Sequence, residues 1–411
     1  MRILQPKNHK ELKKLMQNIK VDPYGIDIML PKSIQRLVRV NSLSCIAANI
    51  LKQQMLSLGA DVALARGALT GKAKKTDCLL MGTLAQFKRL TEKLEKQPFG
   101  LDNLAGDLSD SLTNYQRDEF TLHLGRHKLS LGASKARIIG IVNTAPDSFS
   151  GDGFYRGLSP SKLRVRLTKG ALPEGLVDFT EKMVKEGADI IDIGGESTRP
   201  GAKPVSAKEE LRRTIPLIKK IAGKIKVPIS IDTYKPEVAR QALDNGAVMV
   251  NDVTGLRNNK MIDIVSRYKA GVVIMHMKGK PRNMQNNPVY TSLLDEVIDY
   301  LRDAINRAVA AGIDRKKIII DPGIGFGKSM GHNLEILRNL KEFKILGRPI
   351  LVGVSRKSFL GKILNAGPQE RIFGTVSSST LAVQNGANMV RVHDVKALKD
   401  ALSVLNTINR L

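Results

Sequence analysis

At 411 residues the chain is long enough for a large hydrophobic core and for more than one domain. Hydrophobic residues make up 42% of it, yet no apolar run reaches the roughly 18 residues of a membrane span, so we expect no membrane partner. The two cysteines, Cys45 and Cys78, are too few for a disulfide framework, and this usage favours a reducing cytoplasm.

The net charge is strongly positive, because 66 lysine and arginine residues face 39 acidic residues and give +27. Such a balance suits a nucleic-acid binder, since phosphate neutralisation dominates that affinity. The excess is spread evenly, however: residues 1–130 carry 21 basic and 12 acidic side chains. We therefore expect a basic surface that attracts small anionic substrates, and no nucleic-acid partner. The alternative is a binding protein that works through its basic N-terminal unit, and it requires salt-dependent binding to DNA or RNA without turnover.

Residues 1–118 are predicted to form a small α/β unit of unknown role. Its helix-like and strand-like stretches alternate along the chain and lie at 42–59, 61–65, 77–82 and 84–97. The segment from Gly67 to Lys72 lacks the full spacing of a phosphate-binding loop, so we interpret it as a plain loop. No other catalytic motif is found in this unit.

Residues 119–411 are predicted to form the main domain. It opens with a hairpin at 120–132 that turns at Gly125 and Arg126 and could cover the bottom of this domain. Eight β-branched runs then recur, separated by stretches of helical periodicity, at 137–143, 189–194, 228–232, 248–252, 272–276, 318–321, 349–354 and 388–392. Eight such βα units indicate an α/β fold of the (β/α)₈ TIM barrel type.

Polar residues stand at or just after the ends of these strands. They are Asn143, Glu196, Asp232, Asn251, His276, Asp321, Ser355 to Lys357, Arg391 and His393. Each alone could be a strand terminator or a helix cap. Active sites of barrels lie at the C-terminal ends of the strands, so together these residues predict a site for a polar, partly anionic ligand.

The residue types suggest what such a ligand offers. A flat heterocycle with adjacent N–H donors and a carbonyl needs carboxylate acceptors and a few donors, which Asp232, Asn251, Asp321 and Lys357 supply. Arg391 and His393 alternate onto one face of the last strand and suit a diphosphate.

The first loop carries a candidate metal ligand. Asn143 can bind Mg²⁺ through its side-chain oxygen, because Mg²⁺ on substrate phosphates takes only one or two protein ligands. A buried turn residue is the alternative at this position.

Seven motifs, in order, closely resemble those of bacterial dihydropteroate synthases, over about residues 120–411. They are NTAPDSFSGDG at 143–153, GADIIDIGGESTRPGA at 187–202, SIDTYKPEVARQALDNGAVMVNDVTG at 230–255, VVIMHMKGKP at 272–281, DPGIGFGK at 321–328, VGVSRKSFLG at 352–361 and VRVHDV at 390–395. The resemblance implies a transferase that joins 4-aminobenzoate to a pterin diphosphate, needs Mg²⁺ and forms a homodimer. Ala145 and Gly151-Asp152-Gly153 depart from the family's usual first loop.

The resemblance also implies roles for the residues. The pterin pocket would be formed by Asp232, Asn251, Asp321 and Lys357, the diphosphate and Mg²⁺ site by Asn143, Arg391 and His393, and the aminobenzoate side by Thr198, Arg199, Pro200, Phe326, Lys357 and Ser358. Lys357, Arg391, His393 and Asp321 would be the catalytic residues. The alternative is a pterin-dependent methyltransferase, which should lack the Ser-Arg-Lys segment and the Arg-x-His ending.

Overall fold

The computed structural model describes residues 1–6, 9–132, 135–144, 175–197, 204–279 and 283–409. The chain divides into two compact units, Met1–Thr113 and Asn114–Leu411. Among the described residues, no helix is both long and apolar enough to cross a bilayer.

The first unit is an α/β unit, as predicted. Its elements are α1 (His9–Asn18), α2 (Pro23–Met29), β1 (Gln35–Ser44), α3 (Cys45–Leu56), β2 (Asp61–Leu64), α4 (Arg66–Leu69), β3 (Lys75–Thr83), α5 (Leu84–Leu94) and most of α6 (Leu101–Gln116), with a 3₁₀ turn at Leu30–Lys32. The strands form an antiparallel sheet in the order β1-β3-β2. Strand β1 is missing from the predicted elements, although its side chains alternate between exposed and partly buried along most of its length.

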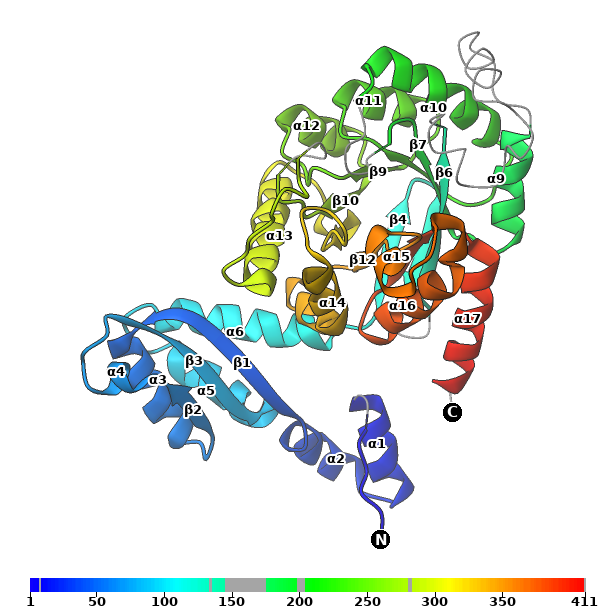
Figure 1. The fold of residues 1–411 in the computed structure, drawn as a ribbon. Helices are drawn as coiled ribbons and strands as arrows, with labels where there is room; N and C mark the ends of the chain where they lie inside the picture. The colour runs from blue at the N-terminus through cyan, green and yellow to red at the C-terminus, as the bar shows by residue number, and fades with distance from the viewer. Residues whose placement is uncertain (7–8, 133–134, 145–174, 198–203, 280–282, 410–411) are drawn as a thin grey trace. The chain divides into compact units, whose positions relative to one another are not determined.

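The second unit contains a closed barrel of eight parallel strands, which confirms the predicted fold class (Figure 1). The strands are β6 (Arg137–Asn143), β7 (Ile190–Gly194), β8 (Ile229–Asp232), β9 (Met249–Asp252), β10 (Gly271–Met275), β11 (Ile318–Asp321), β12 (Leu351–Val352) and β13 (Met389–Val392). They lie side by side in the order β11-β10-β9-β8-β7-β6-β13-β12, and a parallel bridge between Ile320 and Ile350 joins the two ends.

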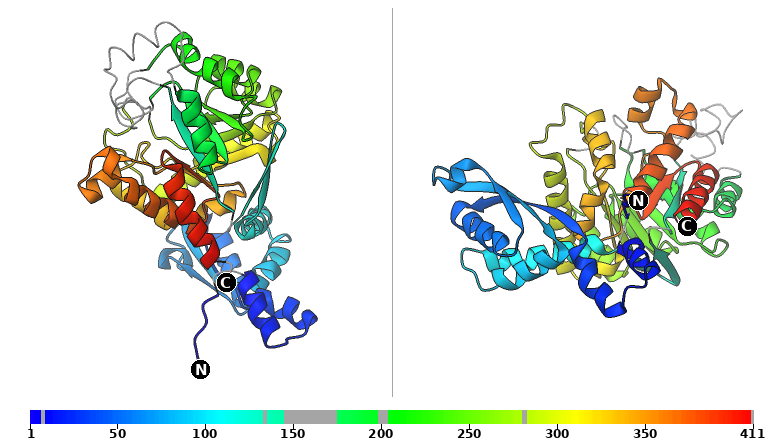
Figure 2. Two further views of the ribbon diagram at one scale, coloured as in Figure 1. Left: turned by 90° about the vertical axis from the view of Figure 1, so that its right-hand side faces the viewer. Right: turned by 90° about the horizontal axis from the view of Figure 1, so that it is seen from below.

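Helices surround these strands, as the two views in Figure 2 also show. They are α9 (Leu176–Lys185), α10 (Ala207–Ile221), α11 (Pro236–Asp244), α12 (Asn259–Arg267), α13 (Leu293–Ala310), α14 (Met330–Arg338), α15 (Ser358–Leu364), α16 (Ile372–Gln384) and α17 (Val395–Ile408), with 3₁₀ turns at Arg315–Lys317, Leu340–Leu346 and Pro368–Glu370. Their apolar faces and the outward side chains of the strands form one large core.

Apolar side chains fill the lower part of the barrel interior. They are Ile139, Ile190, Met249, Val273, Ile319, Leu351 and Met389, mostly from the first residues of their strands. The predicted hairpin, β4 (Phe120–Leu124) with β5 (His127–Leu131), packs Leu122, Leu124 and Leu131 against this layer. The hairpin therefore closes the N-terminal end of the barrel.

Strand alternation places a polar layer directly above the apolar one. Successive side chains point to opposite faces, so residues two positions further along face the same interior. Those positions hold Asp192, Asn251, Asp321 and Arg391. The interior thus changes from apolar to charged toward the C-terminal ends of the strands, which is where a site was expected.

Candidate active site

Four polar side chains from four strands are joined by hydrogen bonds inside the barrel. Arg391 of β13 donates from Nε to Oδ2 of Asp192 at 2.6 Å and from Nη2 to Oδ2 of Asp232 at 2.7 Å. Asn251 donates from Nδ2 to the same oxygen of Asp192 at 2.9 Å. Both carboxylates are buried, with Asp192 fully inaccessible. One guanidinium therefore bridges two carboxylates in a region shielded from water.

The second oxygens of these carboxylates suit a ligand with N–H groups. Oδ1 of Asp192 and Oδ1 of Asp232 are buried, and neither has a hydrogen-bond partner within the described part of the chain. Burial raises the pKa of Asp232 to about 7, against the opposing effect of Arg391 and with a further rise caused by Asp192. Buried acceptors in folded proteins nearly always have a donor, so this pair fits a bound heterocycle that donates to both.

Lys357 is the centre of the opposite half of the site. Its Nζ donates to the carbonyl of Ile324 and lies 4.6 Å from the centroid of the Phe326 ring. Burial lowers the pKa of Lys357 to about 8, and Asp321 opposes this shift. Asp321 is itself buried, and its Oδ1 accepts from the backbone N–H of Gly323 at 2.7 Å.

The two halves meet beside Gly353. A Cβ atom at that position would lie 3.9 Å from Cβ of Arg391 and 4.0 Å from Nζ of Lys357. Arg391 also lowers the pKa of Lys357, and Asp232 raises it, after the larger effect of burial. The side chains are therefore close enough to act on one ligand.

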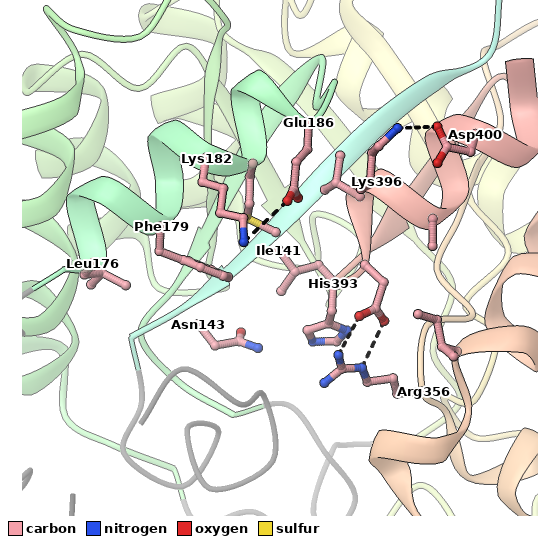
Figure 3. A pocket seen from close by; sticks show the side chains of 15 residues that line it. Ile141, Asn143, Leu176, Phe179, Lys182, Glu186, Arg356, His393, Lys396 and Asp400 are labelled. Carbon is pink, nitrogen blue, oxygen red and sulfur yellow. Dashed lines mark hydrogen bonds and ion pairs between the residues drawn. The ribbon is translucent and has the colours of Figure 1, made fainter. Parts of the chain in front are cut away.

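A cavity of about 490 Å³ opens beside this cluster, between β6, α9 and α17 (Figure 3). Asn143, Arg356 and His393 line one part of it, and Phe179 and Lys396 line the flanking helices. Hydrogen bonds hold two of these groups: His393 Nδ1 lies 2.9 Å from Ser355 Oγ, and Arg356 Nη2 donates to Asp394 at 2.7 Å. The three carboxylates in the lining, Glu186, Asp394 and Asp400, are paired with Lys182, Arg356 and Lys396. The amide of Asn143 and the imidazole of His393 are therefore the groups of this wall that suit an anionic group.

Gly194 connects this cavity with the carboxylate cluster. A Cβ atom there would lie 3.5 Å from Oδ1 of Asn143 and 3.6 Å from Oδ2 of Asp232. The first residue lines the cavity and the second belongs to the cluster, so a ligand with a ring and an anionic tail could occupy both.

The described residues among the sequence candidates lie at one end of the barrel. Asn143, Asp232 and Asp321 are the last residues of their strands, Asn251 is the last but one of β9, and Arg391 lies within β13. His393 and Lys357 come shortly after their strands, Phe326 lies in the loop after β11, and Ser358 begins α15 with an exposed side chain. Thr198, Arg199 and Pro200 lie outside the described residues, as do Ala145 and Gly151 to Gly153.

Asp192 belongs to the site but was not among the sequence candidates. It lies in the middle of β7, whereas the candidates were polar residues at strand ends. A signal was available, because Asp192 is a charged residue inside a strand whose other members are apolar or glycine. Such a residue points either to a buried partner or to a ligand, and Arg391 is that partner.

The donor set fits Mg²⁺ only if the substrate supplies most of the oxygens. Within the described ranges there is no group of three His, Cys, Asp or Glu side chains that could hold a metal. Asn143 faces the cavity with its amide, beside His393 (Figure 3). One amide oxygen together with substrate phosphate oxygens and water is a usual Mg²⁺ arrangement.

A barrel with a buried carboxylate and arginine cluster at its C-terminal mouth is suited to an enzyme that binds a pterin. The family described as pterin binding enzyme matches residues 139–393, and the chain belongs to it. The dihydropteroate synthase of Escherichia coli K12 is 41% identical over 276 residues, covering 67% of this chain and 93% of that protein. Within the pterin-binding enzymes the chain accordingly belongs with the dihydropteroate synthases.

Solved structures agree with this placement. The Xanthomonas albilineans dihydropteroate synthase with 4-aminobenzoic acid is 39% identical, has a TM-score of 0.62 and covers 71% of this chain and 99% of its own. The same enzyme in complex with 7,8-dihydropteroate has a TM-score of 0.60 at 37% identity.

A longer relative also matches the first unit. A probable bifunctional folylpolyglutamate synthase/dihydropteroate synthase of Halobacterium salinarum is 38% identical over 380 residues, which is 92% of this chain. That share cannot be reached without much of Met1–Thr113. The chain spans only 44% of that relative's length.

Proposed function

We propose that this site joins 4-aminobenzoate to 6-hydroxymethyl-7,8-dihydropterin diphosphate and forms 7,8-dihydropteroate and diphosphate, a step in folate biosynthesis. The bond between the exocyclic carbon and the diphosphate oxygen breaks, and its electron pair leaves with the diphosphate. The lone pair of the aminobenzoate nitrogen forms the new C–N bond, and the amine loses one proton to solvent. The observation that carries the proposal is the Asp192–Arg391–Asp232 cluster beside a cavity able to hold an anion.

Recognition of the pterin falls to the buried polar layer. The oxygens of Asp192 and Asp232 that have no partner among the described residues would accept from the ring's amino and N–H groups. Asn251 and Lys357 supply donors for its carbonyl and ring nitrogens, and Asp321 supplies a further acceptor. The site is preorganised for this task, because the same side chains are already fixed by hydrogen bonds.

Departure of the diphosphate is assisted by Arg391, His393 and Asn143. Mg²⁺, held by Asn143 and phosphate oxygens, would neutralise part of the charge that develops on the leaving group when it is bound. His393 is oriented for this role by Ser355, and Arg391 is held by Asp192 and Asp232 of the ring site. No protein nucleophile is needed.

The aminobenzoate would bind on the side of Phe326 and Lys357. An aromatic ring and an ammonium suit a benzoate, whose ring stacks and whose carboxylate pairs. Thr198, Arg199, Pro200 and Ser358 are proposed to complete this side, as the resemblance implies.

The test is an assay of diphosphate release with the purified full chain. Release should require both the pterin diphosphate and 4-aminobenzoate, and exhaustive chelation of Mg²⁺ should abolish it. Release that proceeds without aminobenzoate, or methyl transfer from methyltetrahydrofolate to a corrinoid in its place, would contradict the proposal. Full activity after chelation would remove Asn143 from the metal site.

We also propose that the enzyme is a homodimer that meets through α15, α16 and α17. These helices expose large apolar side chains, among them Ile363, Phe373 and Val404, and Phe373 is 81% accessible. Such a concentration of apolar groups is typical of a surface that pairs with another. Sedimentation of the wild type and of Phe373→Asp should give a dimer and a monomer, respectively.

We place the enzyme in a reducing cytoplasm. Cys45 and Cys78 are both free and buried in the first unit, and burial raises the pKa of Cys78 to about 11. Thiols kept in this form are inert components of a core. Fractionation of the cells that produce the protein tests the location.

A further inference from the structure

Lys328 is a buried lysine that the proposed synthase reaction does not use. It lies in the loop between β11 and α14 and is only 2% accessible. Its Nζ lies 2.8 Å from Nδ1 of His276 and donates to the carbonyl of Phe326 at 3.1 Å. Burial of an ammonium is costly even when it is paired, so a lysine in this place calls for a reason.

His276 serves Lys328 as an acceptor. Burial and the neighbouring charge of Lys328 together lower the pKa of His276 to about 2, so the ring is neutral. With its proton on Nε2, the ring accepts from Lys328 at Nδ1. The ring is held in place by an edge contact with Tyr300, whose centroid is 4.9 Å away.

The loop that carries Lys328 lies directly on the loop after β10. A Cβ atom at Gly323 would come within 1.9 Å of the carbonyl oxygen of His276, and one at Gly327 within 2.3 Å of that of Lys278. Both glycines have positive φ angles, +72° and +62°. Only glycine allows this approach of the two backbones, and the bond between Lys328 and His276 crosses the same contact.

Two groups of this loop hold the Lys357 side chain. The carbonyl of Ile324 accepts from its Nζ, and the Phe326 ring lies beneath it at 4.6 Å. A Cβ atom at Gly325 would lie 3.1 Å from Cδ of Lys357. The place of the Lys357 ammonium therefore depends on where this loop lies.

We propose that Lys328 is a positioning residue for the synthase reaction. By tying the Phe326 carbonyl to His276, it fixes the loop from which Ile324 and Phe326 orient Lys357. The proposal rests on the proposed function, because it assigns Lys328 to the placement of a side chain that contacts the substrates.

Three variants test this role in the full chain. Lys328→Met removes the amino group, and with it the hydrogen-bond donor, at nearly constant length. His276→Leu removes the acceptor. His276→Asn keeps an acceptor near the place of Nδ1, and its side chain has almost the same size and branched shape as that of the leucine variant. Lys219→Met is the matched control, because Lys219 is exposed on α10.

We expect Lys328→Met and His276→Leu to lower kcat/KM for 4-aminobenzoate about 10²-fold, mainly through a higher KM, as a misplacement of about 1 Å can do. His276→Asn should recover most of this loss, and Lys219→Met should match the wild type. Recovery by His276→Asn separates positioning from a general loss of stability, which both His276 variants would share.

Wild-type constants for Lys328→Met would overturn the proposal, and so would an equal loss in His276→Asn and His276→Leu. If Lys328→Met does not fold, the two His276 variants decide. An inactive wild type refutes the proposed function instead, so the two failures are distinguishable.

Discussion

Arg391 and Asp192 are joined across the barrel interior by a hydrogen bond of 2.6 Å between Nε and Oδ2. They come from β13 and β7, which are separated by β6 in the sheet. Because the guanidinium is a rigid planar fork, this bond and the one to Asp232 fix its plane as well as its position. The residue proposed to act on the diphosphate is thus oriented by the residues proposed to bind the ring.

Asp192→Asn should separate this orienting role from the fold. The amide keeps the size of the side chain but removes the charge that Arg391 and Asn251 both contact. We expect kcat/KM for the pterin diphosphate to fall about 10²-fold, since the arginine loses one of its two fixed partners. Steady-state kinetics measure the loss, and unchanged constants would show that Asp192 has no part in the site.

Arg391→Ala should nearly abolish turnover and leave the barrel folded. Its removal leaves two buried carboxylates unpaired, which lowers the free energy of unfolding by about 3–5 kcal/mol. Folded proteins are usually stable by about 5–15 kcal/mol, so we expect the barrel to stay folded. Lys357→Ala should be equally inactive for loss of its ammonium. Arg302→Ala is the control, because its exposed pair with Asp299 contributes little. Circular dichroism and diphosphate release make the comparison, and a folded, fully active Arg391→Ala would refute the assignment.

Activity should fall as the pH rises through about 8, the value to which burial lowers the pKa of Lys357. Below that pH the side chain is an ammonium beside Asp321, and above it the charge is lost. The unfolded chain, with a lysine pKa of 10.5, keeps this proton to a higher pH than the folded protein does. Through this group the free energy of unfolding therefore rises as the pH rises from about 8 to 10.5.

Deprotonation of Lys357 therefore lowers activity in this pH range without destabilising the fold. The pH dependence of kcat, together with thermal unfolding at the same pH values, checks both signs. An alkaline limb that persists in the residual activity of Lys357→Met would assign the ionisation to another group.

The sequence predicts the barrel well because each strand is a short apolar run and the period changes between strands and helices. It also predicts that the described candidate residues gather at one end of the barrel, since parallel strands bring their C-terminal ends to one edge. Which of these side chains bond to one another within the site is harder to predict from the sequence. That Arg391 reaches Asp192 depends on the stagger of β6, β7 and β13, which no local pattern specifies.

Strand β1 is missing from the predicted elements for a different reason. Its end, Ser42 to Ser44, falls in the helix-like stretch that continues into α3. The N-cap Ser44, whose side chain accepts from the N–H of Ala47, marks where that helix begins. The pairing of β1 with β3 connects residues far apart in the chain, and this tertiary contact makes the segment a strand.

The hairpin at the lower end of the barrel should contribute to stability and not to catalysis. Leu124 is fully buried and fits over Gly271, where a Cβ atom would lie 2.3 Å from its Cδ2. Leu124→Ala should lower the free energy of unfolding by about 2–5 kcal/mol, from the lost burial and the cavity that remains. Its kcat and KM at a permissive temperature should equal those of the wild type, because the polar layer with Asp192 and Arg391 lies toward the other end.

Denaturant titration and kinetics test this, with the exposed Leu334→Ala on α14 as the control. An undiminished stability of Leu124→Ala would mean that the hairpin does not seal the barrel, and a selective loss of kcat would mean that the two ends are coupled.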